Sequence, residues 1–244
     1  MTTHYKTKVF VFKKNNTNET DRVFSVFTED FGRLDVFGKA IRKLVSKLRS
    51  GIDTFFISDI EFIQGKSRKT LTEAKALNKF EGLSKDPQKF QAAQKMAGVL
   101  DSLIRGQEKD EKIFDLLSEV FIELDREDFK KYTLLYYYFM WNFLSLLGYK
   151  LQVEKCNICS AKLNPYYIYF SYKSGGAVCK NCSRRDGISQ KISSDIIKIL
   201  RLIYGKEWSI ISKLKIGPIS QKLFEKISDD YYSHIHEELS SKKN

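Results

Sequence analysis

The four cysteines constrain this chain more than any other feature of its sequence. They form two Cys-x-x-Cys pairs, Cys156 with Cys159 and Cys179 with Cys182, with 19 residues between the pairs and no cysteine left over. Each Cys-x-x-Cys turn directs two sulfurs to one point, and two such turns complete the tetrahedral shell that Zn²⁺ prefers. A redox Cys-x-x-Cys would not need a second copy. The spacing therefore predicts one structural Zn²⁺ per chain, because four thiolates leave no coordination position open for water.

The sequence shows no targeting or membrane segment. Residues 1–16 lack the apolar core of a secretory signal. The most apolar stretch, 132–147, is too short and too often interrupted by polar residues to span a bilayer. We therefore expect a cytoplasmic protein with no membrane partner, in which the cysteines stay reduced and act as metal ligands rather than disulfides.

The first eighty residues have the pattern of a small β-barrel. Short segments rich in β-branched and aromatic residues alternate with polar or glycine-marked turns. An OB-fold closes five strands by Greek-key connections and leaves little exposed edge. The five expected strands are 8–13, 22–28, 34–37, 55–63 and 69–76.

The spacing of apolar residues becomes helical after Asp86-Pro87. Apolar residues recur three and four apart between 90 and 124, and 129–147 is apolar almost all round, as in a buried helix. Two further helices are expected, over 192–204 and over an apolar stripe from Ile219 to Leu239. The predicted fold class is α+β, with an OB-fold (1–80), a helical domain (86–150 and 188–244) and a zinc-binding insert (151–187).

Five aromatic residues lie between the cysteine pairs and alternate around Ile168 like one strand of a ribbon. We expect them to pack against the helical body, and stacking on nucleic-acid bases is the alternative. These residues are Tyr166, Tyr167, Tyr169, Phe170 and Tyr172.

The basic residues gather in two places on the expected barrel. The formal net charge of +12 indicates an anionic partner. No acidic residue lies between Asp35 and Asp53, and the next hairpin is also basic. Phosphate contacts by such residues give sequence-independent affinity, whereas an inert, solvated basic face is the alternative. The predicted nucleic-acid ligands are Lys39, Arg42, Lys43, Lys47, Arg49, Lys66, Arg68 and Lys69.

Aromatic residues near these cations have two possible roles. Phe10, Phe31 and Phe37 could stack on bases, but a barrel this small favours them as core residues. In the helical body, Lys130 and Lys131 lead into Tyr132 and Tyr136. Cations beside an aromatic groove are suited to bind an acidic peptide with an apolar end. The alternative is a helix of the bundle that simply carries charged residues at its N-terminal end.

The sequence gives little support for catalysis. It contains no nucleotide-binding loop, no nucleophile elbow and no HExxH zinc motif. A metalloenzyme such as a nuclease would need an open metal site or a cluster of carboxylates, and neither is visible. We therefore expect a protein that is not an enzyme.

Together, these features resemble the bacterial RecO family of recombination mediators. Residues 23–34 are similar to the family's strand–turn–Gly-Arg–strand segment, and 38–43 to the Gly-Ala-Arg-Lys-like stretch that follows it. Residues 143–149, ahead of Cys156, are similar to the Leu-Leu-Gly-Tyr passage of zinc-bearing members. A weaker likeness covers 232–235. The stretch after Gly38 departs from the family pattern, because it has fewer Ser and Arg residues.

The resemblance implies a role in RecF-pathway DNA repair. A family member would bind single- and double-stranded DNA, anneal complementary strands, displace single-stranded-DNA-binding protein and load RecA together with RecR. It would also bind the acidic C-terminal tail of the single-stranded-DNA-binding protein, for which Lys130, Lys131, Tyr132 and Tyr136 are the candidate residues. The alternative is a zinc-ribbon protein of transcription or translation that contacts duplex DNA or RNA.

Overall fold

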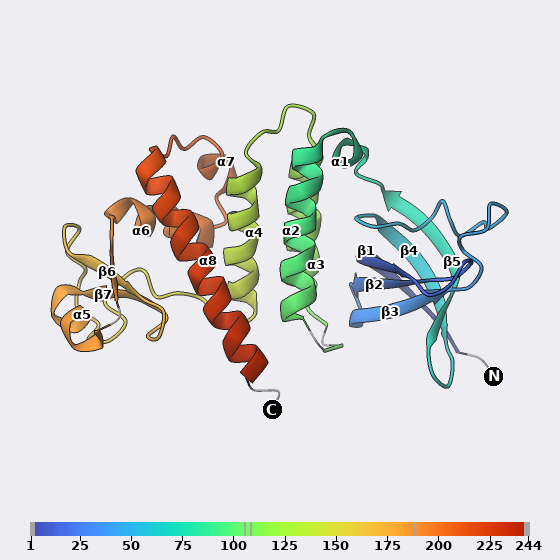
Figure 1. Cartoon of the computed structure of the whole chain (residues 1–244), viewed down its shortest axis with the longest axis horizontal. Coiled ribbons are helices and arrows are strands. Elements are labelled where there is room, and N and C mark those ends of the chain that lie inside the picture. Colours follow the sequence, from blue (N-terminus) through green and yellow to red (C-terminus); the bar gives the residue numbers. More distant parts are fainter. Residues whose placement is uncertain (1–2, 105, 108, 188, 242–244) are drawn as a thin grey trace. The chain divides into compact units, whose positions relative to one another are not determined.

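A closed five-stranded barrel forms the beginning of the chain (Figure 1). This computed structural model describes residues 3–104, 106–107, 109–187 and 189–241, and it divides into two units, residues 1–132 and 133–244. The barrel strands are β1 (His4–Asn16), β2 (Arg22–Thr28), β3 (Gly32–Gly38), β4 (Ile57–Gln64) and β5 (Lys69–Asn78).

The order of the strands identifies the barrel as an OB-fold. It runs β1-β2-β3-β5-β4, and β4 pairs back to β1. The β3–β5 pair is parallel, whereas the other four pairs are antiparallel. Five strands closed in this way leave no free sheet edge. The predicted OB-fold is confirmed.

Three helices complete the first unit: α1 (Glu81–Lys85), α2 (Pro87–Leu103) and α3 (Glu111–Asp125). The start of α2 follows from its sequence. The Asp86 carboxylate accepts the backbone N–H groups of Gln88 and Lys89, at 2.8 and 3.4 Å, and Pro87 occupies the first turn, where no N–H is required. The sequence interpretation had no counterpart for the five-residue α1.

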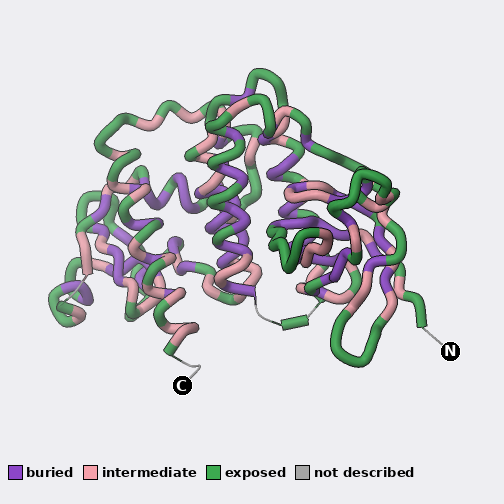
Figure 2. Tube along the Cα trace, turned by 45° about the vertical axis from the view of Figure 1, so that its right-hand side comes forward, coloured by how far each residue is buried: buried purple, intermediate pink, exposed green. Residues whose placement is uncertain are grey.

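Strand β1 is buried on both of its faces. Val9 and Val11 point into the barrel and have no exposed surface. Phe10 points outward, where its ring centroid lies 4.5 Å from that of Phe121 on α3. Because successive side chains point to opposite faces, the strand contributes residues to two cores, one inside the barrel and one between the barrel and the helices. Figure 2 shows this burial as purple along the strands, with the connecting loops mostly green.

The second unit combines helices with a small sheet. Helix α4 (Tyr132–Leu146) starts at the last residue of the first unit and buries a continuous run from Tyr137 to Leu144. The sheet has the order β7-β6-β8, from β6 (Ile168–Ser171), β7 (Gly176–Cys179) and β8 (Gln190–Ile192). The other helices are α5 (Lys180–Asp186), α6 (Ser194–Tyr204), α7 (Trp208–Ile211) and α8 (Pro218–Ser241).

Helices α4 and α8 are joined through a buried tryptophan. The Trp141 indole stacks on the Tyr231 ring at 5.2 Å, and its N–H donates to the Ser228 hydroxyl at 3.0 Å. The apolar stripe expected on α8 is buried at Ile227 and Ile235, whereas Ile219, in the first turn, is 84% exposed.

No helix in the described part of the chain has the length and apolar character needed to cross a lipid bilayer.

Candidate metal centre and nucleic-acid interface

The four cysteine sulfurs converge on one point. The Sγ atoms of Cys156, Cys159, Cys179 and Cys182 all lie within 4.8 Å of one another, and those of Cys159 and Cys179 are 3.8 Å apart. A tetrahedron with Zn–S distances of about 2.3 Å has edges of about 3.8 Å. The donor set therefore fits a single metal ion, as the Cys-x-x-Cys spacing predicted.

The backbone around the cysteines fixes this arrangement. The Cys156 N–H donates to the Ala161 carbonyl at 2.9 Å, which closes the first turn. The Cys179 N–H points to the Cys156 sulfur at 3.4 Å, and Cys179 directly precedes α5, which carries Cys182 in its first turn. Gly176 passes so close to Gln152 that an added Cβ would lie 2.4 Å from its carbonyl oxygen. The local fold thus brings the two cysteine pairs together.

Four thiolates at these distances would repel one another without a cation between them. Burial opposes ionisation of Cys156, but N–H donors from Cys159, Cys179 and Ile158 outweigh it and lower the pKa of this thiol to about 6. Hydrogen bonding to Cys159, together with burial, raises the pKa of Cys182 to about 12. A bound divalent cation would favour the thiolate form at all four cysteines.

Four of the five aromatic residues between the cysteine pairs divide into two groups. Phe170 is buried, with its ring edge-on to Tyr231 at 6.1 Å, and the Tyr172 hydroxyl donates to Asp230 on α8 at 3.1 Å. The expected packing against the helices holds for these two residues. Tyr166 is 80% exposed, and the half-exposed Tyr167 carries the Lys180 ammonium 4.5 Å from its ring centroid.

A groove crosses the barrel over β2 and β3. Its volume is about 630 Å³, and it lies between the β1–β2 loop and the β4–β5 hairpin. In OB-folds this face and these two connections bind oligonucleotides. Its lining includes Asn18 and Asp21 from the first loop, Phe37 from β3, and Gln64, Arg68 and Lys69 from the hairpin.

Arg68 and Phe37 form one wall of this groove. The Arg68 guanidinium lies 3.8 Å from the centroid of the Phe37 ring, close enough for a cation–π contact. A guanidinium held over a ring offers both a charge for phosphate and a planar group on which a base can stack. Phe37 itself is 7% exposed, so the arginine rather than the phenylalanine presents the accessible surface.

Asp21 connects the groove to the first basic stretch. Its carboxylate accepts the Ala40 N–H at 2.6 Å, and the Arg42 guanidinium donates to the Asn18 carbonyl at 2.7 Å. The Ala40 N–H, followed by Asn18, holds the pKa of Asp21 below its ordinary value of 3.8. These bonds fix the beginning of the β3–β4 loop against the β1–β2 loop.

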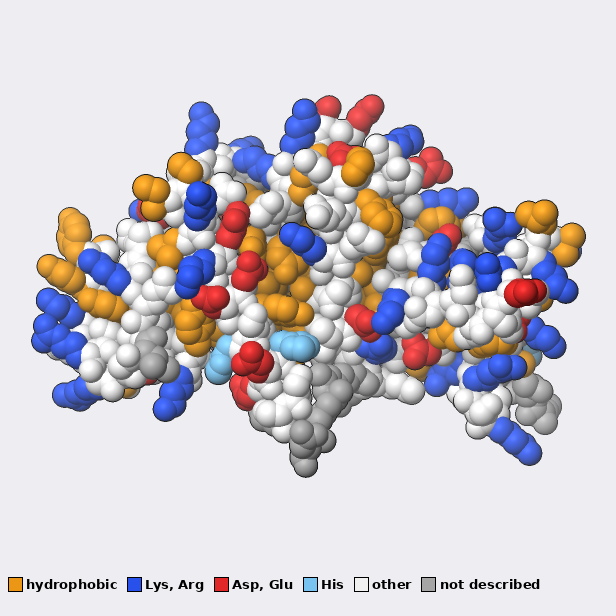
Figure 3. All heavy atoms as spheres, in the orientation of Figure 1, with side chains coloured by type: hydrophobic (Ala, Val, Ile, Leu, Met, Phe, Trp, Pro, Cys, Tyr) orange, Lys and Arg blue, Asp and Glu red, His pale blue; other side chains and the backbone are white. Residues whose placement is uncertain are grey.

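The predicted basic ligands lie on two connections of the barrel. Five side chains extend from the β3–β4 loop, and all five are exposed: Lys39, Arg42, Lys43, Lys47 and Arg49. Lys66, Arg68 and Lys69 belong to the β4–β5 hairpin, and the last two line the groove. Figure 3 shows lysine and arginine side chains gathered over the barrel on the face that it presents.

The three phenylalanines considered as stacking platforms are mainly structural. Phe10 and Phe37 are buried. Phe31 is half-buried and contacts the Phe62 ring at 6.0 Å and the Tyr5 ring at 5.8 Å, both edge-on. The preference for core positions therefore describes their environment correctly.

Comparison with known proteins decides the family. Residues 1–80 match the family model "Recombination protein O N terminal", and residues 84–243 match "Recombination protein O C terminal". The chain belongs to the RecO family. A DNA repair protein RecO from Dehalococcoides mccartyi is 30% identical over 87% of this chain and 83% of its own length. The RecO proteins of Caldanaerobacter subterraneus and Roseiflexus are 23% and 28% identical, over 97% and 96% of this chain and 95% and 81% of their own lengths.

Membership of the RecO family confirms the resemblance seen in the sequence, and it assigns the chain to DNA repair and recombination. The relatives are named as DNA repair proteins. For this RecO-family chain, the cysteine cluster and the barrel groove are thus two separate features of a repair protein, each contained within one unit.

The residues considered for a peptide tail lie in different surroundings. Lys130 and Lys131 are exposed immediately before α4. The Tyr132 hydroxyl donates to Asp86 at 2.8 Å, whereas Tyr136 belongs to the second unit, where burial and then the Asp229 charge raise its pKa. Tyr132 and Tyr136 lie one turn apart on α4, and the use of these four residues as a peptide site stays a prediction.

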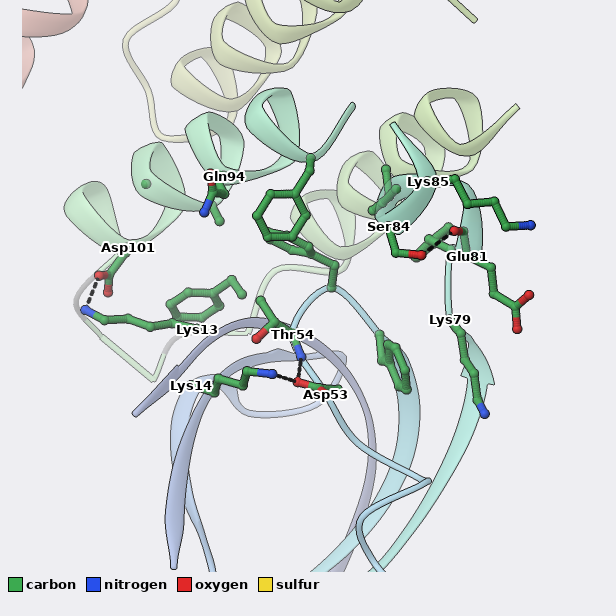
Figure 4. Close-up of a pocket in the computed structure, with 18 residues that line it drawn as sticks. Lys13, Lys14, Asp53, Thr54, Lys79, Glu81, Ser84, Lys85, Gln94 and Asp101 are labelled. Atoms are coloured by element: carbon green, nitrogen blue, oxygen red, sulfur yellow. Dashed lines mark hydrogen bonds and ion pairs between the residues drawn. The ribbon is translucent and has the colours of Figure 1, made fainter. Parts of the chain in front are cut away.

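Sequence reasoning missed a cleft in the first unit, shown in Figure 4. It has a volume of about 880 Å³ and lies beside α1 and α2. Aromatic rings line it, and lysines stand at its edge, two of them paired: Lys13 with Asp101 at 2.7 Å, and Lys14 with Asp53. Lys79 and Lys85 also belong to the lining. Distant segments contribute these residues, so no local pattern in the sequence reveals the cleft.

Proposed function

We propose that the protein is a non-enzymatic recombination mediator that binds single- and double-stranded DNA and anneals complementary strands. The observation that carries this proposal is the groove over β2 and β3, which Arg68 lines and to whose edge, at Asn18 and Asp21, the basic β3–β4 loop is hydrogen-bonded. Phosphate contacts from such a loop hold DNA of any sequence, and a groove that admits unpaired bases favours single strands.

The metal is Zn²⁺ in this proposal, and its role is structural. Four thiolates and tetrahedral spacing suit zinc, and a filled shell leaves no position for a reactive water. Cys156 and Cys182 are buried, so the site supports the short β6–β7–β8 sheet from inside. The proposed absence of catalysis rests on this closed site and on the lack of a catalytic motif in the sequence.

The proposed partners follow from the role of a mediator in the cytoplasm. Single-stranded DNA in cells is coated, so a mediator needs contacts with the coating protein as well as with the strand. We infer that the chain binds the C-terminal tail of single-stranded-DNA-binding protein and acts with RecR to load RecA. We also propose the division into OB-fold (1–80), helical domain (86–150 and 188–244) and zinc-binding insert (151–187), which limited proteolysis would test.

A strand-annealing assay tests the main proposal. Two complementary oligonucleotides are mixed with the protein, with and without prior coating by single-stranded-DNA-binding protein. A mediator accelerates annealing in both cases. A zinc-ribbon protein of transcription or translation, the second candidate, would instead prefer duplex DNA or structured RNA and would leave the annealing rate unchanged.

Charge reversal tests the basic loop. In the variant Lys39→Glu/Arg42→Glu/Lys43→Glu, affinity for unrelated DNA sequences should fall about equally, because phosphate contacts carry no base information. The slope of log affinity against log salt should become shallower by roughly 0.7 per lost contact on single strands. The control Lys206→Glu/Lys213→Glu/Lys215→Glu makes the same charge change in the second unit. Equal slopes in both variants and the wild type would rule out the loop as the DNA contact.

A fluorescent tail peptide tests the partner site. A free carboxylate and an apolar side chain need a cation beside an apolar groove. If the residues predicted from the sequence form that site, Lys130→Glu/Lys131→Glu should weaken binding at least tenfold. Lys79→Glu/Lys85→Glu, at the edge of the aromatic cleft, is the matched variant. Loss of binding only in this second variant would move the site to the cleft.

A further inference from the structure

Two apolar side chains stand almost free in solvent at the tip of the β3–β4 loop. Leu44 is 89% exposed and Val45 is 87% exposed. They are neighbours in the sequence, so together they form one exposed apolar surface. A leucine and a valine in such a position gain free energy when an apolar surface covers them.

The loop that carries them is anchored rather than loose. Ile41 and Ile52, near its two ends, are each 2% exposed and belong to the barrel core, and Leu48 packs against that core. Successive turns run between these anchors, including Ser46 N–H to the Lys43 carbonyl at 3.0 Å. Gly51 passes so close to β5 that an added Cβ would lie 2.0 Å from the Ala74 carbonyl oxygen. The loop therefore has little freedom to fold its tip back onto the barrel.

The residues around Leu44 and Val45 indicate which partner this part of the loop binds. Lys43 and Lys47 flank the two apolar residues, and no acidic residue lies between Asp35 and Asp53. Such a site needs a partner with an apolar surface next to negative charge. Nucleic acids offer both, because their bases lie a few ångströms from their phosphates. The loop is also bonded to the edge of the DNA groove, through Ala40 to Asp21 and Arg42 to Asn18. A lipid surface suits the tip less well, because the loop forms turns rather than an amphipathic helix.

We propose that Leu44 and Val45 form an apolar wedge that enters between adjacent bases of single-stranded DNA where the strand leaves the groove. Inserted leucine and other apolar side chains unstack bases in several DNA-binding proteins. The neighbouring lysines hold the phosphates on either side of the insertion. This inference rests on the proposed DNA-binding function, and it adds a residue-level role that phosphate contacts alone do not provide.

An oligonucleotide containing 2-aminopurine tests the wedge, because the fluorescence of this base rises when it is unstacked. The wild type should increase the fluorescence, and Leu44→Ser/Val45→Ser should lose most of the increase. Affinity measured by anisotropy should fall about tenfold, within the range for loss of a stacking contact. The salt dependence should stay unchanged, because no phosphate contact is removed. Leu44→Phe, which keeps a large apolar side chain, should retain the signal.

The control is Ile219→Ser, which removes an equally exposed apolar side chain, 84% exposed, from the second unit. It should leave both fluorescence and affinity as in the wild type. If Leu44→Ser/Val45→Ser keeps the full fluorescence increase, the wedge is overturned while DNA binding stands. If it loses binding only to phosphatidylserine vesicles, the tip serves a lipid surface and the proposal is wrong. If the wild type binds no DNA at low salt, the proposed function itself fails.

Discussion

The barrel and the segment around the four cysteines differ in how their structure is maintained. The barrel has a continuous apolar core, from Val9 on β1 to Leu71 on β5, and every strand is paired on both sides. The cysteine segment has strands of three or four residues, and its pairs converge on one cluster of sulfurs. Stability spread over a core should decline gradually with single substitutions. Stability concentrated in one site should be lost at once when that site fails.

The sharpest test of this contrast is removal of the metal. Structural zinc sites contribute on the order of 10 kcal/mol at neutral pH, so Cys156→Ser should empty the site and unfold 151–187. Elemental analysis should fall from one zinc per chain toward zero, and limited proteolysis should cut this segment first. Tyr166→Ala, which changes an 80% exposed residue in the same segment, is the control. Wild-type protein that is purified without chelator and contains no metal would contradict the proposed site.

A core substitution should affect the barrel without affecting the metal. Phe62 is 2% exposed and its ring stacks on Tyr5 at 5.4 Å. Phe62→Ala should lower the free energy of unfolding of the first unit by about 3–5 kcal/mol, because it leaves a cavity. Denaturant unfolding and zinc content should be measured together. Phe90→Ala, at a 42% exposed position, should have a much smaller effect. Loss of zinc in Phe62→Ala would show that the two regions are not independent.

A buried lysine tests whether a single residue in the first unit also contributes strongly to the free energy of unfolding. Lys89 is 3% exposed, and its ammonium group donates to the carbonyls of Asp125 and Arg126 at the end of α3, at 3.2 and 2.5 Å. Lys89→Met keeps the length of the side chain but leaves both carbonyls without this donor. We expect a loss of about 1–3 kcal/mol in the free energy of unfolding. No loss in thermal or denaturant unfolding would mean that water replaces the ammonium without penalty.

The smallest expected effect concerns pH and the Asp101 ion pairs. Partial burial alone would raise the pKa of Asp101, but Lys13 and Arg33 together lower it below 3.8. The folded pKa is therefore below the unfolded one, so this carboxylate stabilises the fold above about pH 4 and the contribution disappears as the pH falls through the folded value. Relative to the wild type, Asp101→Asn should be less stable by about 1 kcal/mol at pH 6, and the difference should shrink steadily as the pH is lowered below 4. A difference that does not change with pH would contradict this assignment.

Several features could be predicted from the sequence because they depend on local pattern. The Cys-x-x-Cys spacing determined which four residues meet, since a turn of that length fixes two sulfurs at once. A run rich in valine and phenylalanine predicted strand β2 to the residue, over 22–28, and helical spacing predicted α6 up to Tyr204. The basic loop was likewise visible as a run of cations with no acidic residue. In each case the information lies within a few neighbouring residues.

Only the tertiary structure decided which surfaces those patterns meet. Alternation shows that Phe10 and Val11 point to opposite sides of β1, but not that Phe10 packs on Phe121, 111 residues later. Nor does it show that Leu44 and Val45 remain exposed while Ile41, from the same loop, enters the core. The groove and the aromatic cleft have the same origin, because both are lined by segments that are distant in the chain. The sequence by itself determined the barrel strands, the longer helices and the four cysteines that meet, whereas burial depends on long-range packing, which no local periodicity records.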